Sequence, residues 1–166
     1  MEGRVLGNLN GWNIGENLYK WIIDNIEPNK TILELGSGTG TIELVKHYNV
    51  FSVEQNKEYV GLEPKSNYVY APLVNYEGRK MWYDLNWWDL PSDYDLLLID
   101  GPIGSNRRNF IDHIHLFKHL NHTKIIIDDT NRRWDRWLVD EILKVWTNKK
   151  IIKEISDGKK TATVLG

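Results

Sequence analysis

Residues 31–40 read TILELGSGTG, and this stretch decides the fold. Its first half, residues 31–35, is a short apolar run, and its second half is a glycine-rich turn. The residues that follow, 41–48, have the apolar spacing of a helix. Glycines let a backbone turn sharply and approach a ligand closely, and a helix N-terminus adds unpaired N–H groups with a partial positive charge. The order of strand, glycine turn and helix therefore predicts a ligand-binding turn of a kind that many nucleotide folds use.

Two details distinguish this turn from the dinucleotide-binding type. Its glycines, Gly36, Gly38 and Gly40, follow the pattern G-x-G-x-G, whereas the dinucleotide pattern is G-x-G-x-x-G. An acid, Glu34, also lies two residues before the first glycine. An acid at this place suits a ligand that carries a cation better than one that carries a pyrophosphate.

A second acid ends the next predicted strand. Residues 50–53 read VFSV, and Glu54 follows them, about 20 residues after Glu34, which is the spacing of a βαβ nucleotide-binding unit. The alternative is a glycine-capped core turn with two solvated acids. Because strand, turn, helix, strand and acid all fall in register, the pattern favours the nucleotide-binding unit.

The sequence ELGSGTG at residues 34–40, with the acid after the next strand, resembles the first two motifs of class I methyltransferases that use S-adenosylmethionine. The resemblance implies a methyltransferase with the methionine part and sugar of this cofactor on the glycine turn and the ribose hydroxyls on Glu54. A later strand ends in Asp100, where the family has its reactive edge. Ala71 stands where the family often has an acid for the adenine, so backbone groups near residues 70–73 are expected to hold it. The expected cofactor-binding residues are Glu34, Gly36, Ser37, Gly38, Thr39, Gly40, Glu54, Ala71 and Asp100.

The remaining pattern follows the order of the same family. The run at 95–100, DLLLID, is continuously apolar before its final acid, as in a central parallel strand. The other expected elements are a helix at 16–26, strands at 67–71 and 124–128, an extended excursion at 80–91, helices at 110–120 and 134–146, and a closing hairpin of 150–155 and 161–165. The predicted fold is α/β: a Rossmann-like, doubly wound, mostly parallel seven-stranded sheet with a C-terminal antiparallel hairpin.

Length and composition limit the number of domains and the kinds of site that the chain can have. The 166 residues predict a single domain, 1–166, with an N-terminal helix region at 1–28 and a core at 29–166. Residues 1–10 read as an irregular lead-in, and Trp12 either covers the cofactor or packs against the entry of the first helix. The chain has no cysteine, which excludes disulfides, thiolate zinc sites and a cysteine nucleophile.

Charge and hydropathy predict the compartment and the partners. The net charge is −2, without a basic tail, so nucleic acid is not the expected partner. The sequence shows no secretion signal and no stretch of membrane-spanning length, so we expect a cytoplasmic protein without a membrane partner.

Three acids follow neighbouring central strands. Asp100 ends one strand, and Asp128 and Asp129 end the next, so all three are expected at one edge of the sheet. We expect Asp100 to be catalytic. Together the three resemble the magnesium site of catechol-type O-methyltransferases, and Mg²⁺ favours all-oxygen ligands. The alternative is that Asp128 and Asp129 cap the next helix and pair with Arg132 or Arg133.

Aromatic and basic residues predict the nature of the methyl acceptor. Aromatic side chains suit sugar rings and planar molecules, and arginines suit carboxylate or phosphate oxygens. We therefore expect a hydroxyl of a small molecule or glycan, anionic in character, at an open site or one completed by a second subunit in a homo-oligomer. The expected acceptor-binding residues are Trp82, Tyr83, Arg107, Arg108, Arg132 and Arg133, with Trp87 and Trp88 extending the aromatic wall. The alternatives are a packed aromatic cluster or subunit contact, and arginines that neutralise the three acids or lie on helix surfaces.

Alternative functions remain open at this point. They are methylation of RNA or protein, and binding or cleavage of the cofactor without methyl transfer. A narrower resemblance, to small bacterial and phage methyltransferase-like domains, rests on residues 70–73, 82–84 and 100–102 with Arg108 and Arg132. It implies the same fold and cofactor and leaves the acceptor unassigned.

Overall fold

The computed structural model describes residues 14–166, so the predicted lead-in and Trp12 lie outside it. In chain order the elements are α1 (Glu16–Asn25), β1 (Thr31–Leu35), α2 (Thr39–Leu44), β2 (Asn49–Glu54), β3 (Asn67–Tyr70), β4 (Leu73–Asn75), β5 (Met81–Tyr83), η1 (Trp87–Asp89), β6 (Leu96–Ile99), η2 (Gly104–Leu116), β7 (Lys124–Ile127), α3 (Arg133–Val145), β8 (Ile151–Asp157) and β9 (Lys160–Leu165). The two η elements are 3-10 helices.

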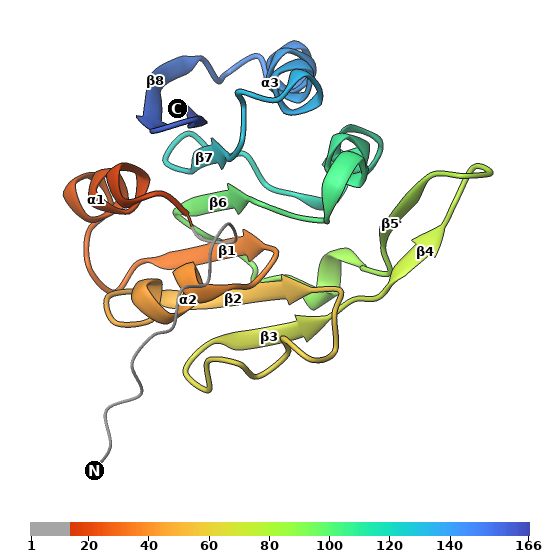
Figure 1. Ribbon diagram of the computed structural model, residues 1–166, viewed down its shortest axis with the longest axis horizontal. Helices are drawn as coiled ribbons and strands as arrows, with labels where there is room; N and C mark the ends of the chain where they lie inside the picture. Colours follow the sequence, from red (N-terminus) through yellow and green to blue (C-terminus); the bar gives the residue numbers. More distant parts are fainter. Residues whose placement is uncertain (1–13) are drawn as a thin grey trace.

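Seven strands form one sheet in the order β3-β2-β1-β6-β7-β9-β8. The first five of these strands are parallel, and β9 pairs antiparallel with both β7 and β8. The predicted doubly wound α/β fold with its closing hairpin is confirmed. Because β1 lies between β2 and β6, the strand order reverses beside β1, and open α/β sheets bind ligands at such a switch point. The carboxyl ends of β1, β2, β3 and β6 point to the same side in Figure 1.

Both faces of the sheet are covered, which explains why the central strands are continuously apolar. Alternate residues of β1 face opposite sides: Ile32 packs with α1 and α2, whereas Leu33 and Leu35 pack with η2 and α3. All four residues of β6 are buried. Within residues 14–166 no helix is both long and apolar enough to cross a membrane.

The connection after β6 differs from the predicted α-helix at 110–120. It is the 3-10 helix η2, and it begins six residues earlier, at Gly104. Arg107 and Phe110 are buried, and the ring of His113 stacks on Trp82, so the inward-facing residues recur every three positions, which is the 3-10 period. The prediction counted apolar residues alone and therefore missed the turn that begins with a buried arginine.

Within 80–91, predicted as an extended excursion, residues 81–83 form β5 and residues 87–89 form η1. The strand β5 pairs antiparallel with β4 in a hairpin that projects beyond the carboxyl ends of the strands in Figure 1. The hairpin is tied to η2. The Tyr76 hydroxyl donates to the Asp112 carboxylate at 2.9 Å, and the Trp82 indole stacks on the His113 ring with centroids 5.2 Å apart. The hairpin and η2 are thus held together next to the edge where the strands end.

The turns after β1 and β6 touch through two glycines. Gly36 has φ +90°, which favours glycine, and a Cβ there would lie 3.2 Å from the Gly101 backbone nitrogen. A Cβ on Gly101 would lie 2.2 Å from the Tyr83 hydroxyl and 3.0 Å from the Gly36 nitrogen. The first glycine of the sequence motif is therefore required partly because another backbone packs against it.

Gly101→Ala should destabilise the fold by about 1–3 kcal/mol, because the new methyl group overpacks the contact with Tyr83 and Gly36. Tyr83→Phe should recover part of that loss, since the phenol oxygen makes the shortest contact and has no hydrogen-bond partner among residues 14–166. Denaturant unfolding of the parent, both single variants and the double variant measures the coupling. A Gly101→Ala protein as stable as the parent would contradict the close approach.

Candidate functional site at the carboxyl edge of the sheet

Glu54, at the end of β2, holds the glycine turn in place. One carboxylate oxygen accepts the backbone N–H of Ser37 at 2.8 Å, and the other accepts the N–H of Asn56 at 2.7 Å. The Glu54 residue is only 5% exposed. The acid predicted to meet ribose hydroxyls thus lies against the glycine turn, where a nucleoside would contact both.

Glu34 lies deeper than its predicted contact with a ligand cation requires. One of its oxygens accepts hydroxyl hydrogen bonds from Thr41 of α2 and Ser52 of β2, each at 2.6 Å. Burial raises the pKa of Glu34 to about 7, although both hydroxyl donors favour the charged form. In this structure Glu34 joins α2 to β2 behind the turn.

Two residues that the sequence analysis did not single out complete the support of the turn. The Thr41 hydroxyl accepts the N–H of Gly38 at 3.0 Å, and the Tyr68 hydroxyl lies 2.9 Å from the Ser37 hydroxyl. The sequence could have predicted the role of Thr41, because the side chain three residues after a helix N-cap often accepts the backbone N–H of that N-cap residue. Tyr68 gave no such signal, since its role depends on β3 pairing with β2.

Ala71 lies directly after β3 and is fully buried. Its N–H donates to the Glu54 carbonyl at 2.9 Å. The expected adenine-binding segment is thus fixed beside the acid at the end of β2, by a backbone hydrogen bond and not by a side chain.

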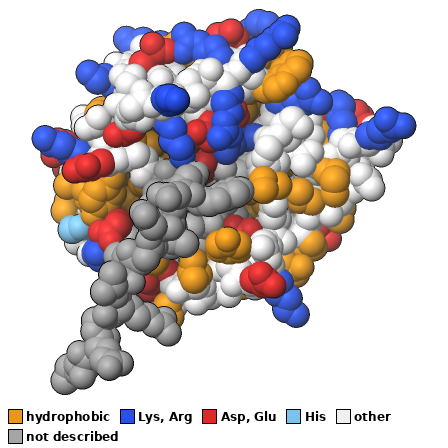
Figure 2. Space-filling model, in the orientation of Figure 1, with side chains coloured by type: hydrophobic (Ala, Val, Ile, Leu, Met, Phe, Trp, Pro, Cys, Tyr) orange, Lys and Arg blue, Asp and Glu red, His pale blue; other side chains and the backbone are white. Residues whose placement is uncertain are grey.

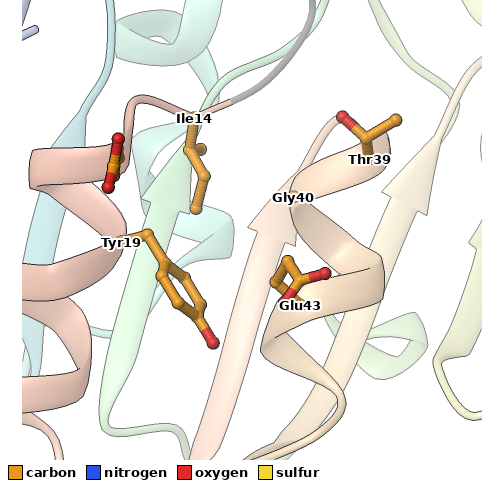
Figure 3. A pocket seen from close by; sticks show the side chains of 6 residues that line it. Ile14, Tyr19, Thr39, Gly40 and Glu43 are labelled. Atoms are coloured by element: carbon orange, nitrogen blue, oxygen red, sulfur yellow. The ribbon is translucent and has the colours of Figure 1, made fainter. Parts of the chain in front are cut away.

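A hollow of about 250 Å³ lies between α1 and α2, where α2 begins at the end of the glycine turn. Figure 3 shows Ile14 and Tyr19 facing Thr39 and Glu43 across it. Ligand clefts usually have about 300–1,000 Å³. The hollow is therefore too small to be the whole cofactor site, and it borders the helix side of the turn.

The acids after β6 and β7 converge as predicted, and a buried arginine lies among them. Ligand oxygens of Asp100, Asp128 and Asp129 lie within 4.8 Å of one another. Arg107 of η2 is 4% exposed, and its guanidinium lies 3.1 Å from an Asp100 carboxylate oxygen and 3.4 Å from one of Asp129. The same group donates to the Asp128 carbonyl and lies 3.4 Å from Asp135. Arg107, predicted to contact the acceptor, instead holds these acids together.

Two more cations reach this acid cluster, defined as Asp100, Asp128, Asp129 and Asp135. Arg132 Nη1 lies 3.0 Å, and Lys160 Nζ 3.9 Å, from the Asp129 carboxylate. With Arg107 this gives three cations for four acids. Burial raises the pKa of Asp100 to about 8, against the attraction of the Arg107 guanidinium. With Asp100 protonated, the charges of the acid cluster and its cations balance at neutral pH.

The acid cluster does not fit a resident magnesium ion. Asp128 Oδ2 and Asp129 Oδ1 are buried without hydrogen-bond partners among the described residues, which would suit a cation. However, the Arg107 guanidinium already lies between the Asp100 and Asp129 carboxylates, and Lys160 approaches the unpaired oxygen of Asp129. A divalent ion there would face a buried positive charge at short range.

The predicted aromatic wall divides into two groups. Trp82 and Tyr83 are 1% and 3% exposed, so they are core residues in this structure and present no surface to an acceptor. Trp87 and Trp88 are 68% and 64% exposed and pack edge to face on each other. Only the second pair lies where an acceptor could reach it.

The predicted acceptor arginines also divide. Arg107 and Arg132 pair with the acid cluster, as described above. Arg108 and Arg133 instead approach the ring of Trp134, at 4.7 and 5.4 Å from its centroid. Figure 2 shows Lys and Arg side chains gathered over the upper half of the visible face, with acidic side chains between them.

Comparison with known proteins gives matches in structure alone. No protein-family model matches the chain, and no curated protein sequence matches it either. The 16S rRNA methylase ArmA superposes with a TM-score of 0.54 at 17% identity, over 89% of this chain and 79% of ArmA. E. cuniculi Mtq2-Trm112, which methylates the termination factor eRF1, gives 0.53 at 19% identity over 92% and 94%. A SAM-dependent methyltransferase from Aquifex aeolicus gives 0.53 at 14% identity over 91% and 89%.

The raised pKa values predict that stability falls as pH rises. Asp100 and Glu34 hold their protons in the folded state up to about pH 8 and 7, whereas unfolded carboxyl groups release theirs near pH 4. The folded state therefore binds more protons, and the free energy of unfolding decreases between about pH 4 and 8. The Asp100 side chain is 26% exposed, and solvent screens its interactions. Its contribution to the fall in the free energy of unfolding is therefore below about 1.4 kcal/mol per pH unit.

Thermal melts at pH 5, 6, 7 and 8 measure this dependence. Each loss of about 1 kcal/mol lowers the melting temperature by about 2–4 °C. Asp100→Asn and Glu34→Gln should each flatten the curve, because each removes one proton that the folded state retains. If the melting temperature of the parent protein rises from pH 5 to pH 8, Asp100 and Glu34 are not protonated in the folded state.

Mn²⁺ used as a probe for Mg²⁺ should not bind the parent protein below millimolar concentration, because Arg107 occupies the acid cluster. Arg107→Ala frees the carboxylates and should bind Mn²⁺ at least about 10-fold more tightly, as an all-oxygen site does. Arg108→Ala, outside the acid cluster, is the matched control. Calorimetry measures both, and micromolar binding of Mn²⁺ to the parent would mean that the arginine does not exclude a metal.

Proposed function

Because the chain has the fold of the class I S-adenosylmethionine-dependent methyltransferases, we propose that it is an enzyme of that class. In this proposal it transfers the methyl group of S-adenosylmethionine to a hydroxyl of a small, anionic molecule or glycan. The acceptor is the least constrained part of the proposal, since the structural neighbours named above act on different molecules.

One observation carries the cofactor assignment: the Glu54 carboxylate accepts the N–H of Ser37 inside the glycine turn. This contact joins the two motifs of the resemblance at the switch point of the sheet. Both Glu54 oxygens keep lone pairs for ribose hydroxyls. The close approach of Gly36 and Gly101 leaves backbone, without side chains, at the place where the methionine part would lie.

The chemistry needs orientation and a proton acceptor. When bound, the cofactor would supply an electrophilic methyl group on a sulfonium. The acceptor oxygen would bond to that methyl carbon in line with the departing S-adenosylhomocysteine, and the hydroxyl proton would pass to a base. Asp100 is the proposed base in its deprotonated form, whose fraction grows as the pH approaches the pKa of about 8, and its backbone N–H is fixed to the Leu35 carbonyl at 3.0 Å. Arg107 positions the Asp100 carboxylate through its ion pair.

The anionic character of the acceptor rests on the arginines at the same edge. Arg108 and Arg133 lie in the elements that follow β6 and β7, and neither pairs with a carboxylate among residues 14–166. The exposed pair Trp87 and Trp88 supports either an acceptor surface or a contact between two copies of the chain.

An RNA or protein acceptor is the second candidate. It is supported by the neighbours, of which one methylates 16S rRNA and another methylates the factor eRF1. Binding or cleavage of the cofactor without transfer is the third. Incubation of the protein and methyl-labelled cofactor with a cell extract separates the three, because label enters a small molecule that is not a fragment of the cofactor, a macromolecule, or neither.

The protein should bind S-adenosylmethionine and S-adenosylhomocysteine but not NAD. Glu54→Gln should weaken this binding at least about 10-fold, because an amide oxygen is a poorer acceptor than a carboxylate. The matched control is Glu58→Gln, an exposed glutamate just beyond β2. Calorimetry measures the affinities, and binding of NAD in place of S-adenosylmethionine would exclude the proposed function.

A further inference from the structure

Two arginines from different loops converge on one tryptophan at the carboxyl edge. Arg108 comes from η2, after β6, and Arg133 and Trp134 begin α3, after β7. Both guanidinium carbons lie within 5.4 Å of the centroid of the Trp134 ring. We call these three residues the arginine–tryptophan cluster. Trp134 is 45% exposed, so the cluster is open to solvent.

The two guanidinium groups differ from the arginines around them. Arg107 and Arg132 pair with aspartates, and Arg136 of α3 pairs with Glu154 of β8. Neither Arg108 nor Arg133 forms an ion pair or a hydrogen bond with any residue of the described chain. Both positive charges lie beside one ring and repel each other, so an anion that contacts both would be stabilised.

The tryptophan ring holds these cations in place without using their donors. A cation over an aromatic face is attracted by the ring electrons, and the guanidinium N–H groups remain available for hydrogen bonds. An ordered guanidinium loses less entropy when it binds an anion than a freely moving one does. The cluster is thus organised for a ligand that accepts several hydrogen bonds.

We propose that Arg108 and Arg133 form a subsite for a phosphate group carried by the methyl acceptor. The role as part of the acceptor site rests on the proposed function; the binding of phosphate does not. A phosphate monoester carries a charge near −2 and three acceptor oxygens, which matches two unpaired guanidinium groups. A carboxylate has one charge and would leave one arginine without a partner.

The pairing of nearby cations favours a small ligand over a polynucleotide. A nucleic-acid strand needs a row of free cations along its backbone. At this edge Arg107 and Arg132 are paired with acids, and Lys80 of the β4–β5 hairpin pairs with Glu77 and Asp112. The subsite therefore fits one phosphate group, on a sugar or on a nucleotide.

Calorimetry with uridine 5′-monophosphate, glucose 1-phosphate and inorganic phosphate tests the proposal. S-Adenosylhomocysteine is present in excess, so that the nucleotide cannot occupy the cofactor site. At low ionic strength we expect the phosphorylated compounds to bind at least about 10-fold more tightly than uridine or glucose. Whether uridine 5′-monophosphate or glucose 1-phosphate binds more tightly identifies the kind of molecule that carries the phosphate.

Variants locate the binding. Arg108→Gln and Arg133→Gln should each lower the affinity for the phosphorylated probe about 10-fold. Trp134→Ala should also lower it, and Trp134→Phe should retain most of it, because phenylalanine keeps an aromatic face for the guanidinium groups. Arg136→Gln, on the same helix but paired with Glu154, is the matched control and should not change the affinity. Melting curves confirm that each variant is folded.

Three results would overturn the proposal. They are equal affinity for a compound with and without its phosphate, unchanged affinity in folded Arg108→Gln and Arg133→Gln proteins, and affinity for glucuronate equal to that for glucose 1-phosphate. Tight, strongly salt-dependent binding of a single-stranded oligonucleotide would overturn the choice of a small ligand. A protein that binds phosphate at this cluster but not S-adenosylhomocysteine would refute the proposed function and leave the subsite standing.

Discussion

Two turns touch at the carboxyl edge of the sheet, and neither can carry a side chain where they meet. The Gly36 and Gly101 backbones lie so close that a Cβ on Gly101 would fall 3.0 Å from the Gly36 nitrogen. Because β1 and β6 pair in the sheet, the turns that follow them leave side by side, and the two glycines let these turns touch. The glycine turn, fixed by Glu54, therefore lies next to the turn that begins with Asp100, the proposed base.

The electrostatics of that edge depend on one buried arginine. Arg107 neutralises acids that would otherwise repel one another, and it does so from a 3-10 helix that starts directly after β6. Removing one partner of a buried charge network leaves the others uncompensated, which costs more than the pair itself contributes. Burial raises the pKa of Asp100 against the attraction of Arg107, and the nearby Asp128 and Asp129 raise it further. Stability and the proposed proton transfer therefore depend on the same balance of charges.

A net charge of −2 conceals how unevenly the arginines are used. Arg107, Arg132 and Arg136 are paired with acids of the same chain, whereas Arg108 and Arg133 both lie against one tryptophan and pair with no acid among the described residues. The net charge disfavours a polyanion as the partner, and the pairing of most of these arginines with acids supports that conclusion. The two arginines without an acid can still bind a single anionic group. The distribution of partners is thus more informative than the sum of charges.

The sequence by itself determined the sheet, the glycine turn and the convergence of the acids. These follow from local patterns: an apolar run, a glycine spacing, and an acid at the end of each strand, all read along the chain with period two or 3.6. Tertiary structure alone decided which predicted residues are exposed. Trp82 and Trp87 are close in sequence and chemically alike, yet Trp82 of β5 is buried against η2 and Trp87 is exposed to solvent. Arg107 and Arg108 are adjacent, and only the direction of each side chain from η2 separates a buried ion pair from an open cation. Such differences arise from contacts between segments distant in sequence, which no local pattern records.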